Sequence, residues 1–257
     1  MPRQRPKPNA TPDDIAFGIN ACTLAIETGH ATSLLYLGES ANERVHALAA
    51  AARAKGIRAE PVPVARLDEL TGGGVHQGIL VRLRAFQPVS LREVARRDGP
   101  ALVLLLDRVT DPQNVGAILR TAVAVGAAAV VLPRRRGALL TPGVHRASAG
   151  VSFLAPVAAP QNLAQALATL KEAGFWAVGA DAGPGSAVAT AFDWPHRTAL
   201  VLGNEGEGVG QLLLRECDFR VALPMDPRVE SLNVAVACGA LSYLWRRQWP
   251  APVASDA

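Results

Sequence analysis

Two short stretches, each after an apolar run, together supply amide, carboxylate and guanidinium side chains along with glycine. The first, Asp107–Arg120, contains Asn114. The second, Gly203–Gly210, holds four glycines and two glutamates, of which Glu205 comes first. Glycine lets backbone N–H and C=O groups approach a ligand closely because no Cβ intervenes, and arginine presents a permanent cation with five N–H donors. These residue types predict a site that holds one ligand by backbone and a second, polar group by side chains.

The glycine-rich stretch lies within Leu200–Ala237, around which we expect the site to form. The preceding apolar residues Ala199–Leu202 are too few for a helix and predict a buried strand. A helix over Gln211–Cys217 and a strand over Phe219–Leu223 should follow, and a long apolar helix should open at Ser231. The glycine pattern is not a dinucleotide fingerprint, because it lies far from the first strand. Two strand ends and one helix start predict a pocket made mainly of backbone.

Arg120 is the only charged residue in a helix predicted over Val115–Val125. The other side chains are apolar or small on every side, so we expect this helix to be buried. A buried arginine needs a partner, since an unpaired charge is costly to bury. Gly116, one turn earlier on the same face, leaves room beside the guanidinium. The partner is either Asp107 or Asp111 in an internal salt bridge, or the substrate.

Two apolar runs predict strands of one parallel sheet. Ala101–Leu106 reads as a central strand, and Val130–Leu132 as its neighbour. Ligands of open α/β sheets gather at the carboxyl ends of the strands. Arg134, Arg135 and Arg136 follow the second strand at that edge, so we interpret them as a phosphate-binding run, with a solvated loop as the alternative.

The front of the chain predicts a separate small α/β unit. Helices are expected over 13–28, 42–55 and 64–70, and strands over 33–37, 58–61 and 78–82. His76 and Gln77 follow a TGGG turn, where they either satisfy the turn by hydrogen bonds or contact a ligand. The expected division is a tail at 1–12, a small domain at 13–86, a linker at 87–98, a large domain at 99–248 and a tail at 249–257.

Composition fits this α/β organisation. Of the 257 residues 49% are hydrophobic but only 5% aromatic, so the core should consist of Ala, Val and Leu. The net charge of +4 does not by itself indicate nucleic-acid binding. Cys22, Cys217 and Cys238 are far apart and form no metal-binding spacing, so we expect buried thiols and no metal site. Because no apolar run is long enough to span a bilayer, we expect a cytoplasmic protein.

Three motifs in order resemble those of the SpoU (TrmH) family of RNA ribose 2′-O-methyltransferases, in the SPOUT superfamily. Asp107–Ala122 resembles the first motif, Leu200–Gly208 together with Leu223–Met225 the second, and Ser231–Val236 the third. Within this family the alternatives to an enzyme acting on 23S rRNA are a tRNA ribose methyltransferase and a resistance-type rRNA methyltransferase. A different class would be an RNA-binding ribosome-assembly factor that keeps the fold without catalysis.

The front half, with Phe17–Ala21 and Val75–Ile79, is similar to the substrate-binding domain of one subgroup. That subgroup methylates a guanosine in the peptidyl-transferase region of 23S ribosomal RNA. Asn20 stands where the subgroup usually has His, Asn204 where Ala or Ser is common, and Pro227–Glu230 fills a loop usually built of small residues. These departures bear on the nucleotide more than on the reaction.

The resemblance implies an α/β fold with a C-terminal SPOUT knot, a trefoil-knotted parallel sheet with helices on both faces, after a small α/β substrate-binding domain. It implies S-adenosylmethionine as cofactor, in a pocket lined by Gly203, Leu223, Met225 and Leu232, and no metal. It also implies RNA as partner and a homodimer through the last helix. Leu232–Leu244 is apolar around its whole circumference, which agrees with such an interface.

The resemblance also implies residue roles. Arg120 acts either as general base or as a charged group that stabilises the developing alkoxide. We favour the second because a guanidinium does not readily lose a proton. Asn114 would anchor the ribose or Arg120, and Glu205 would orient Arg120 or Asn233. Ser231 and Asn233 would hold the nucleotide, unless Ser231 is a plain helix cap. The residues expected to contact RNA are Arg134, Arg135, Arg136, His76 and Gln77.

Overall fold

The computed structural model describes residues 14–38, 41–134 and 140–250. Its contacts divide the chain into two units. Unit 1 comprises Met1–Phe86 and Leu140–Leu154, and unit 2 comprises Gln87–Leu139 and Ala155–Ala257. Leu140–Leu154, which the sequence analysis placed in the large domain, therefore groups with the small one. The predicted tail at 1–12 lies outside the described residues, as does most of the tail at 249–257.

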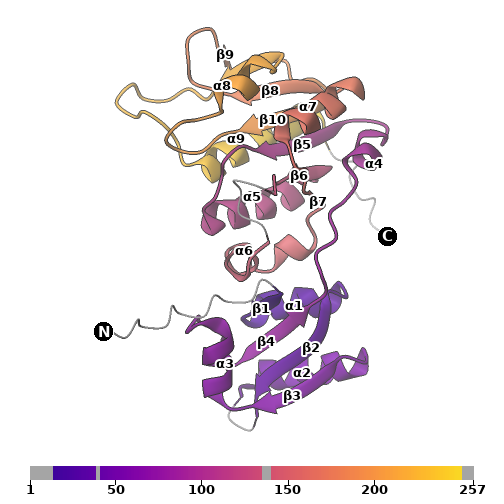
Figure 1. Ribbon diagram of the computed structural model, residues 1–257. Helices are drawn as coiled ribbons and strands as arrows, with labels where there is room; N and C mark the ends of the chain where they lie inside the picture. Colours follow the sequence, from indigo (N-terminus) through magenta and orange to yellow (C-terminus); the bar gives the residue numbers. More distant parts are fainter. Residues whose placement is uncertain (1–13, 39–40, 135–139, 251–257) are drawn as a thin grey trace, which may run out of the picture. The chain divides into compact units, whose positions relative to one another are not determined.

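Unit 1 is a small α/β sandwich, as predicted (Figure 1). Its strands are β1 (Ile15–Phe17), β2 (Ala31–Leu37), β3 (Arg58–Val62) and β4 (Ile79–Leu83), in the order β1-β4-β2-β3. Its first three helices are α1 (Ile19–Glu27), α2 (Glu43–Ala54) and α3 (Val64–Thr71). The buried side chains of α1 and α2 form one cluster with Leu34 and Val81, whereas Leu67 of α3 joins a second with Leu80. Leu80 and Val81 are neighbours on β4, and neighbouring strand residues point to opposite faces of a sheet. The helices therefore cover both faces.

The start of unit 1 differs from the single helix predicted over 13–28. A strand, β1, pairs antiparallel with β4 before α1 begins. The two elements are separated by Gly18, whose φ of 86° ends the strand. Gly18 has no side chain to cap α1, and Gln77 Oε1 accepts the bond from the Ile19 amide at 2.9 Å instead. The three buried apolar residues of β1 continue the helical pattern of α1, so periodicity alone could not separate them.

The segment Leu140–Leu154 packs onto the first strand and helix of unit 1. It forms α6 (Pro142–Ala147) and a 3-10 turn, η1 (Val151–Phe153), which contact β1 and α1. Gly150 permits the close approach, because a Cβ there would lie 2.8 Å from the Asn20 carbonyl oxygen. His145 is buried, stacks on Phe153 with ring centres 4.3 Å apart, and shares a 2.8 Å hydrogen bond with Ser152.

Unit 2 contains a seven-stranded parallel sheet, which confirms the predicted large domain fold. The order is β7-β6-β5-β10-β8-β11-β9. The strands are β5 (Ala101–Leu106), β6 (Ala129–Val131), β7 (Val157–Ala158), β8 (Trp176–Ala180), β9 (Ala187–Val188), β10 (Arg197–Leu202) and β11 (Phe219–Ala222). Although β10 comes late in the chain, it lies beside β5 in the centre. The carboxyl ends of strands from both halves of the domain therefore meet at one edge.

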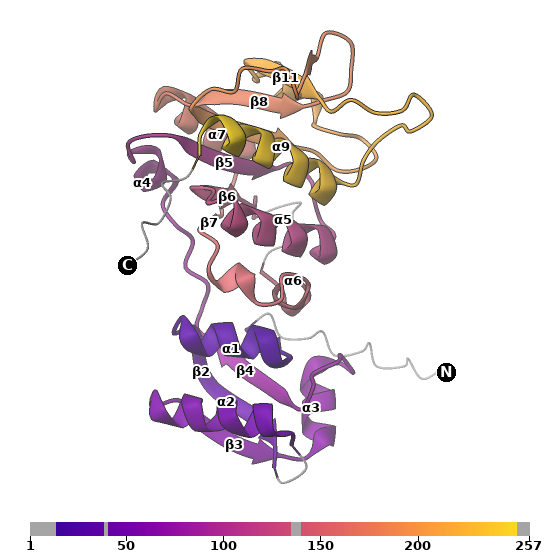
Figure 2. The ribbon, with the colours of Figure 1, turned by 180° about the vertical axis from the view of Figure 1, so that it is seen from behind.

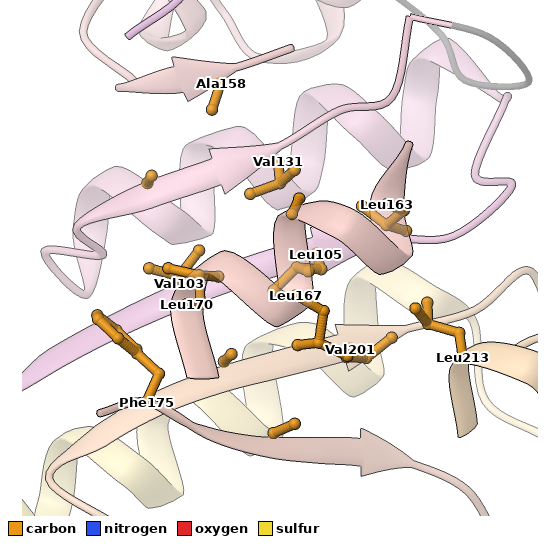
Figure 3. Packing of buried hydrophobic residues seen from close by; sticks show 14 of the residues in the cluster. Val103, Leu105, Val131, Ala158, Leu163, Leu167, Leu170, Phe175, Val201 and Leu213 are labelled. Carbon is orange, nitrogen blue, oxygen red and sulfur yellow. The ribbon is translucent and has the colours of Figure 1, made fainter. Parts of the chain in front are cut away.

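Helices cover both faces of this sheet. The buried residues of α4 (Leu91–Ala95), α7 (Leu163–Glu172) and α8 (Gln211–Arg215) share a core with alternate residues of β5, β6 and β10. Figure 3 shows the side chains that α7 and α8 contribute to it. On the other face, α5 (Pro112–Ala124) and α9 (Val234–Gln248) lie side by side (Figure 2). Burial of this apolar surface stabilises the unit by about 25 cal/mol per Å². The trefoil knot implied by the resemblance stays a prediction.

The three cysteines are covered to different degrees. Cys22 and Cys238 are buried and Cys217 is half-buried. Burial, with the nearby Asp218 carboxylate, raises the pKa of the Cys217 thiol to about 11. A protonated thiol is a poor nucleophile. Cys22 and Cys238 are buried as predicted, whereas Cys217 is only partly covered. Among the helices that the structure describes, none is long and apolar enough to cross a membrane.

Candidate active site

A cavity of about 280 Å³ opens at the carboxyl edge of the unit 2 sheet. Its walls come from the segments that follow β8, β10 and β11 and from the start of α9. This edge is where open α/β sheets bind their ligands, and the volume is close to the lower end, about 300 Å³, of ordinary ligand pockets. All four predicted cofactor residues line the cavity, namely Gly203, Leu223, Met225 and Leu232.

Gly203 shows why this wall consists of main chain. A Cβ built on Gly203 would lie 1.9 Å from the carbonyl carbon of Gly208. No side chain fits in that space, so the loop after β10 folds directly back onto its own start. The loop that lines the cavity can therefore take this shape only with glycine at position 203.

The Gly203–Gly210 loop is held in shape by Asn204. The Asn204 Oδ1 accepts hydrogen bonds from the amides of Gly206 at 3.1 Å and Glu207 at 2.7 Å. The Gly208 amide donates to the Asn204 carbonyl at 3.0 Å. Alanine could make neither of the two side-chain bonds. The departure from the family pattern at Asn204 thus adds bonds that fix the turn.

Three predicted catalytic residues meet beside the cavity. Asn114, in the first turn of α5, donates from Nδ2 to Glu205 Oε1 at 2.8 Å. Asn233 Nδ2 donates to Asn114 Oδ1 at 2.8 Å and to the same Glu205 oxygen at 2.5 Å. Asn233 also caps α9, because its Oδ1 accepts from the amides of Ala235 and Val236. Residues from three segments, up to 119 positions apart, therefore fix one another's orientation.

The triad of Asn114, Glu205 and Asn233 leaves a carboxylate oxygen available. Both of its bonds to Glu205 end on Oε1, and among the described residues no hydrogen bond reaches Oε2. All three side chains are at least partly exposed. A carboxylate held by two amides, with one free oxygen, can accept a hydrogen bond from a hydroxyl group of a ligand.

Ser231 lines the same cavity without capping the helix. The cap of α9 is Asn233, so the alternative interpretation of Ser231 as the N-cap is wrong. The exposed hydroxyl of Ser231 is on the cavity wall, next in sequence to Leu232.

Arg120 is exposed, which corrects the prediction of a helix buried on every side. Only part of α5 faces the sheet, and Arg120 lies outside that part. The salt-bridge alternatives are also wrong. Asp107 Oδ2 accepts from the Gly210 amide at 2.8 Å, and Asp111 caps α5 through the Gln113 amide at 3.1 Å. Within the described chain, Arg120 has no hydrogen bond or ion pair and does not line the cavity.

His76 and Gln77 are engaged inside unit 1. His76 Nε2 lies 3.1 Å from Asp68 Oδ1, and its Nδ1 accepts from the Gly78 amide at 3.0 Å. Gln77, at a φ of 52°, caps α1 as described above. This geometry matches a turn satisfied by its own side chains, so RNA contact by these two residues stays a prediction.

Only one residue of the predicted phosphate-binding run is described. Arg134 is exposed, and its Nε donates to the Ala159 carbonyl at 3.1 Å. Arg135 and Arg136 lie outside the described residues. Contact of this run with phosphate groups stays a prediction.

Part of the cavity wall was not predicted from the sequence. Asp181, Ala182 and Gly183 follow β8 and line the cavity, as does Glu230 in the loop before α9. Asp181 could have been found by the rule that was applied to Asp107, since each carboxylate comes directly after a parallel strand. In the described part of the chain, no group of three His, Cys, Asp or Glu residues could hold a metal ion.

Comparisons with known proteins assign this geometry to a family. Residues 101–243, more than half of the chain, match the model of the SpoU rRNA methylase family. The chain belongs to this family. Residues 15–89 match a second model, described as RNA 2′-O ribose methyltransferase substrate binding. The SpoU match thus covers the sheet and the cavity of unit 2, and the second match covers the four strands of unit 1.

Relatives of this SpoU protein are similar over nearly its whole length. YacO of Bacillus subtilis (strain 168), assigned to the TrmH family of tRNA/rRNA methyltransferases, is 35% identical over 92% of this chain and 97% of its own. The AdoMet-bound rRNA methyltransferase of Sinorhizobium meliloti is 27% identical, with a TM-score of 0.76 over 92% of this chain and 88% of that one. AviRb of Streptomyces viridochromogenes, in complex with AdoMet, is 25% identical, with a TM-score of 0.77 over 91% and 90%.

These matches confirm the resemblance and the cofactor. The chain is an RNA methyltransferase of the SpoU family that uses S-adenosylmethionine. The cavity fits that cofactor, since the main chain of Gly203 lines it and apolar Leu223, Met225 and Leu232 can cover a flat base. Asp181 and Glu230 place two carboxylates on the remaining walls.

Proposed function

We propose that this protein methylates a ribose 2′-hydroxyl of RNA, in a guanosine of 23S ribosomal RNA. The observation that carries the proposal is the triad of Asn114, Glu205 and Asn233 beside a cavity lined by main chain. Amide and carboxylate groups suit the hydroxyls of a ribose better than the ring of a base, which would call for stacking side chains. The description of the second matching model, for residues 15–89, supports ribose as the acceptor.

The triad would orient the acceptor ribose for in-line attack. S-adenosylmethionine supplies an activated methyl group on its sulfonium. The 2′-hydroxyl must lose its proton at or before attack, and lowering its pKa by about five units requires roughly 7 kcal/mol. Glu205 Oε2 accepts from a ribose hydroxyl, and Ser231 holds the nucleotide from the cavity wall. Orientation of this kind removes part of the barrier before the bond forms.

Arg120 would supply a positive charge that stabilises the negative charge developing in the reaction. Its exposure and its lack of a partner in the described chain leave the guanidinium available to an RNA phosphate and to the developing alkoxide. It stays charged throughout, since a guanidinium does not readily deprotonate, and water or a neighbouring group takes the proton.

A homodimer through α9 would complete the site. The part of α9 that does not pack on the sheet still exposes apolar side chains, with Val236 58% and Tyr243 55% accessible. Apolar side chains in a row on one helix favour an interface. Because α9 contacts α5, a second copy seated there would also lie near the helix that carries Arg120. We propose that the two copies together bring Arg120 to the cavity.

The presence of unit 1 favours ribosomal RNA over tRNA. The Sinorhizobium rRNA methyltransferase matches 92% of the chain, whereas the tRNA-modifying TrmH/SpoU enzyme of A. aeolicus matches 62%, with a TM-score of 0.53. With few aromatic residues, the protein should hold RNA by phosphates and shape. We place the reaction in the cytoplasm, where ribosomes are assembled.

The test is methyl transfer from tritiated S-adenosylmethionine to total RNA from a strain that lacks the gene, with 23S rRNA and tRNA separated afterwards. A 2′-O-methyl group blocks alkaline cleavage of its linkage, so the label should appear in alkali-resistant dinucleotides that begin with guanosine. Label in mononucleotides would place the methyl on a base and overturn the ribose assignment. Label only in tRNA would select the tRNA alternative, and no transfer with intact RNA binding would favour the assembly factor.

A further inference from the structure

Arg108, the residue between Asp107 and Val109, has an unusual backbone. Its φ of 59° lies in the left-handed region, which non-glycine residues rarely adopt. Holding a long side chain there is energetically costly. Such conformations persist where surrounding contacts offset the cost, and they occur often at functional sites. The contacts of the Arg108 side chain should therefore offset this cost.

The Arg108 side chain reaches the glycine loop by three routes. Its Nη2 donates to the Gly208 carbonyl at 3.1 Å, and its Nη1 pairs with the Glu207 carboxylate. Its Nε lies 3.3 Å from Asp107 Oδ2, the same oxygen that accepts from the Gly210 amide. Arg108 and Asp107 together fix Glu207, Gly208 and Gly210 to the end of β5.

These contacts determine where the cavity wall lies. The outer half of the loop is tied to Arg108, and the loop is folded too tightly at Gly203 for its two halves to move independently. Asn204 adds two bonds between the halves. A shift of the outer half would therefore move Glu205 away from Asn114.

Arg108 also balances negative charge around the loop. Three carboxylates, Asp107, Glu205 and Glu207, belong to the loop or to the strand end beside it. Within the described residues, the ion pairs of Asp107 and Glu207 are both with Arg108. Although partial burial lowers the pKa of Arg108, the Asp107 charge and the bonds to both carboxylates raise it above its ordinary value. The guanidinium therefore stays charged.

We propose that Arg108 is a positioning residue, which holds the Gly203–Gly210 loop in the shape that binds the cofactor and presents Glu205. Arg108 does not line the cavity and is not a catalytic residue. The effect of Arg108 on cofactor affinity and on Glu205 rests on the proposed function. Its effect on the shape of the loop does not depend on that function, since it involves only contacts within the chain.

The test compares Arg108→Gly with Arg108→Lys. Glycine removes the contacts but relieves the left-handed strain, so the variant should fold with a melting temperature close to that of the wild type. Its Kd for S-adenosylmethionine, measured by titration calorimetry, should rise about tenfold, which is the effect of losing about 1.4 kcal/mol. Lysine, which keeps the charge, should recover part of the affinity. The matched control Arg58→Ala removes an exposed ion pair of unit 1 and should leave the Kd unchanged.

Amide hydrogen exchange without cofactor tests the loop directly. In Arg108→Gly the amides of Gly208 and Gly210 should exchange at least about tenfold faster, because their bonds are no longer held in place. Unchanged exchange and wild-type affinity in a folded Arg108→Gly would overturn the proposal. If the wild type binds the cofactor but transfers no methyl group to RNA, the proposed function is wrong. The comparison of amide exchange between the wild type and Arg108→Gly still tests the role of Arg108 in that case.

Discussion

Both units have polar residues next to the start or end of a strand, but the roles of these residues differ between the units. In unit 1, His76 bonds to Asp68 and Gly78, and Gln77 caps α1, so these side chains serve the fold. In unit 2, Asn114 and Glu205 bond to each other across 91 positions, beside a cavity. The comparison shows that a polar residue indicates a site only when its partners leave it accessible to a ligand. Changes to these unit 1 side chains should therefore lower stability, whereas changes to the unit 2 side chains should impair the reaction.

The largest effect is expected from Arg120→Ala. Because Arg120 has no partner in the described chain, its removal should not lower stability, but methyl transfer should fall by about 10²–10³-fold or more, as for other groups that stabilise a developing negative charge. The Kd for S-adenosylmethionine should stay within a few-fold. Arg215→Ala, which removes another exposed arginine of unit 2, serves as control and should keep its activity. Joint loss of cofactor binding and activity would show that Arg120 is structural.

Gly203→Ala should act on the cofactor. The added methyl group would lie 1.9 Å from the Gly208 backbone, so the loop must open. We expect the Kd for S-adenosylmethionine to rise at least about 100-fold, equivalent to about 2.7 kcal/mol. Gly206→Ala is the matched control, since its methyl group would meet only Asn204 Oδ1 at 3.9 Å, and it should cause a much smaller loss. Equal losses in both variants would argue against the close approach at Gly203.

Unit 1 should lose stability in acid through His145. Burial, followed by the charge of His30, lowers the pKa of His145 from 6.5 to about 4. The unfolded chain therefore binds more protons between these values, so stability is complete above pH 6.5 and falls as the pH approaches 4. The loss from this group is roughly 3 kcal/mol. Hydrogen exchange of α1 amides should accelerate over this range, and His145→Gln should flatten the pH dependence. A wild-type profile in that variant would contradict the assignment.

His76→Ala should give the smallest effect, confined to unit 1. Loss of its bonds to Asp68 and Gly78 should destabilise that unit by about 1–2 kcal/mol, since the Gly78 amide is left unpaired. Tryptophan fluorescence would not report the change, because all four tryptophans lie in unit 2. Hydrogen exchange of β4 amides should be measured instead. Cofactor affinity should not change. Reduced RNA affinity with unchanged stability would instead support the prediction that His76 contacts RNA.

The sequence predicted those features that depend on local pattern. The apolar runs of β5 and β10 specified buried strands, and the glycines specified a backbone-lined turn. The position of β1 could not be predicted, because three buried residues before Gly18 fit a helix and a strand equally well. The exposure of Arg120 was also missed. Apolar neighbours show that a helix packs against something, but not which of its residues face away from the sheet.

Long-range contacts were the other limit. No pattern within Leu140–Leu154 shows that it packs on α1 of the small unit rather than on its own domain. The bonds of Arg108 to Glu207 and Gly208 likewise join residues about 100 positions apart. By contrast, the four residues expected to bind the cofactor, Gly203, Leu223, Met225 and Leu232, all line one cavity, because the resemblance supplied the tertiary arrangement that spacing lacks.

The most direct test is a crystal structure of the protein with S-adenosylhomocysteine at saturating concentration. We expect ligand density in the cavity at the ends of β8, β10 and β11, in contact with the Gly203 and Leu232 main chain, and an ordered Glu205 between Asn114 and Asn233. Density at any other place in the chain, or an ordered but empty cavity, would contradict it.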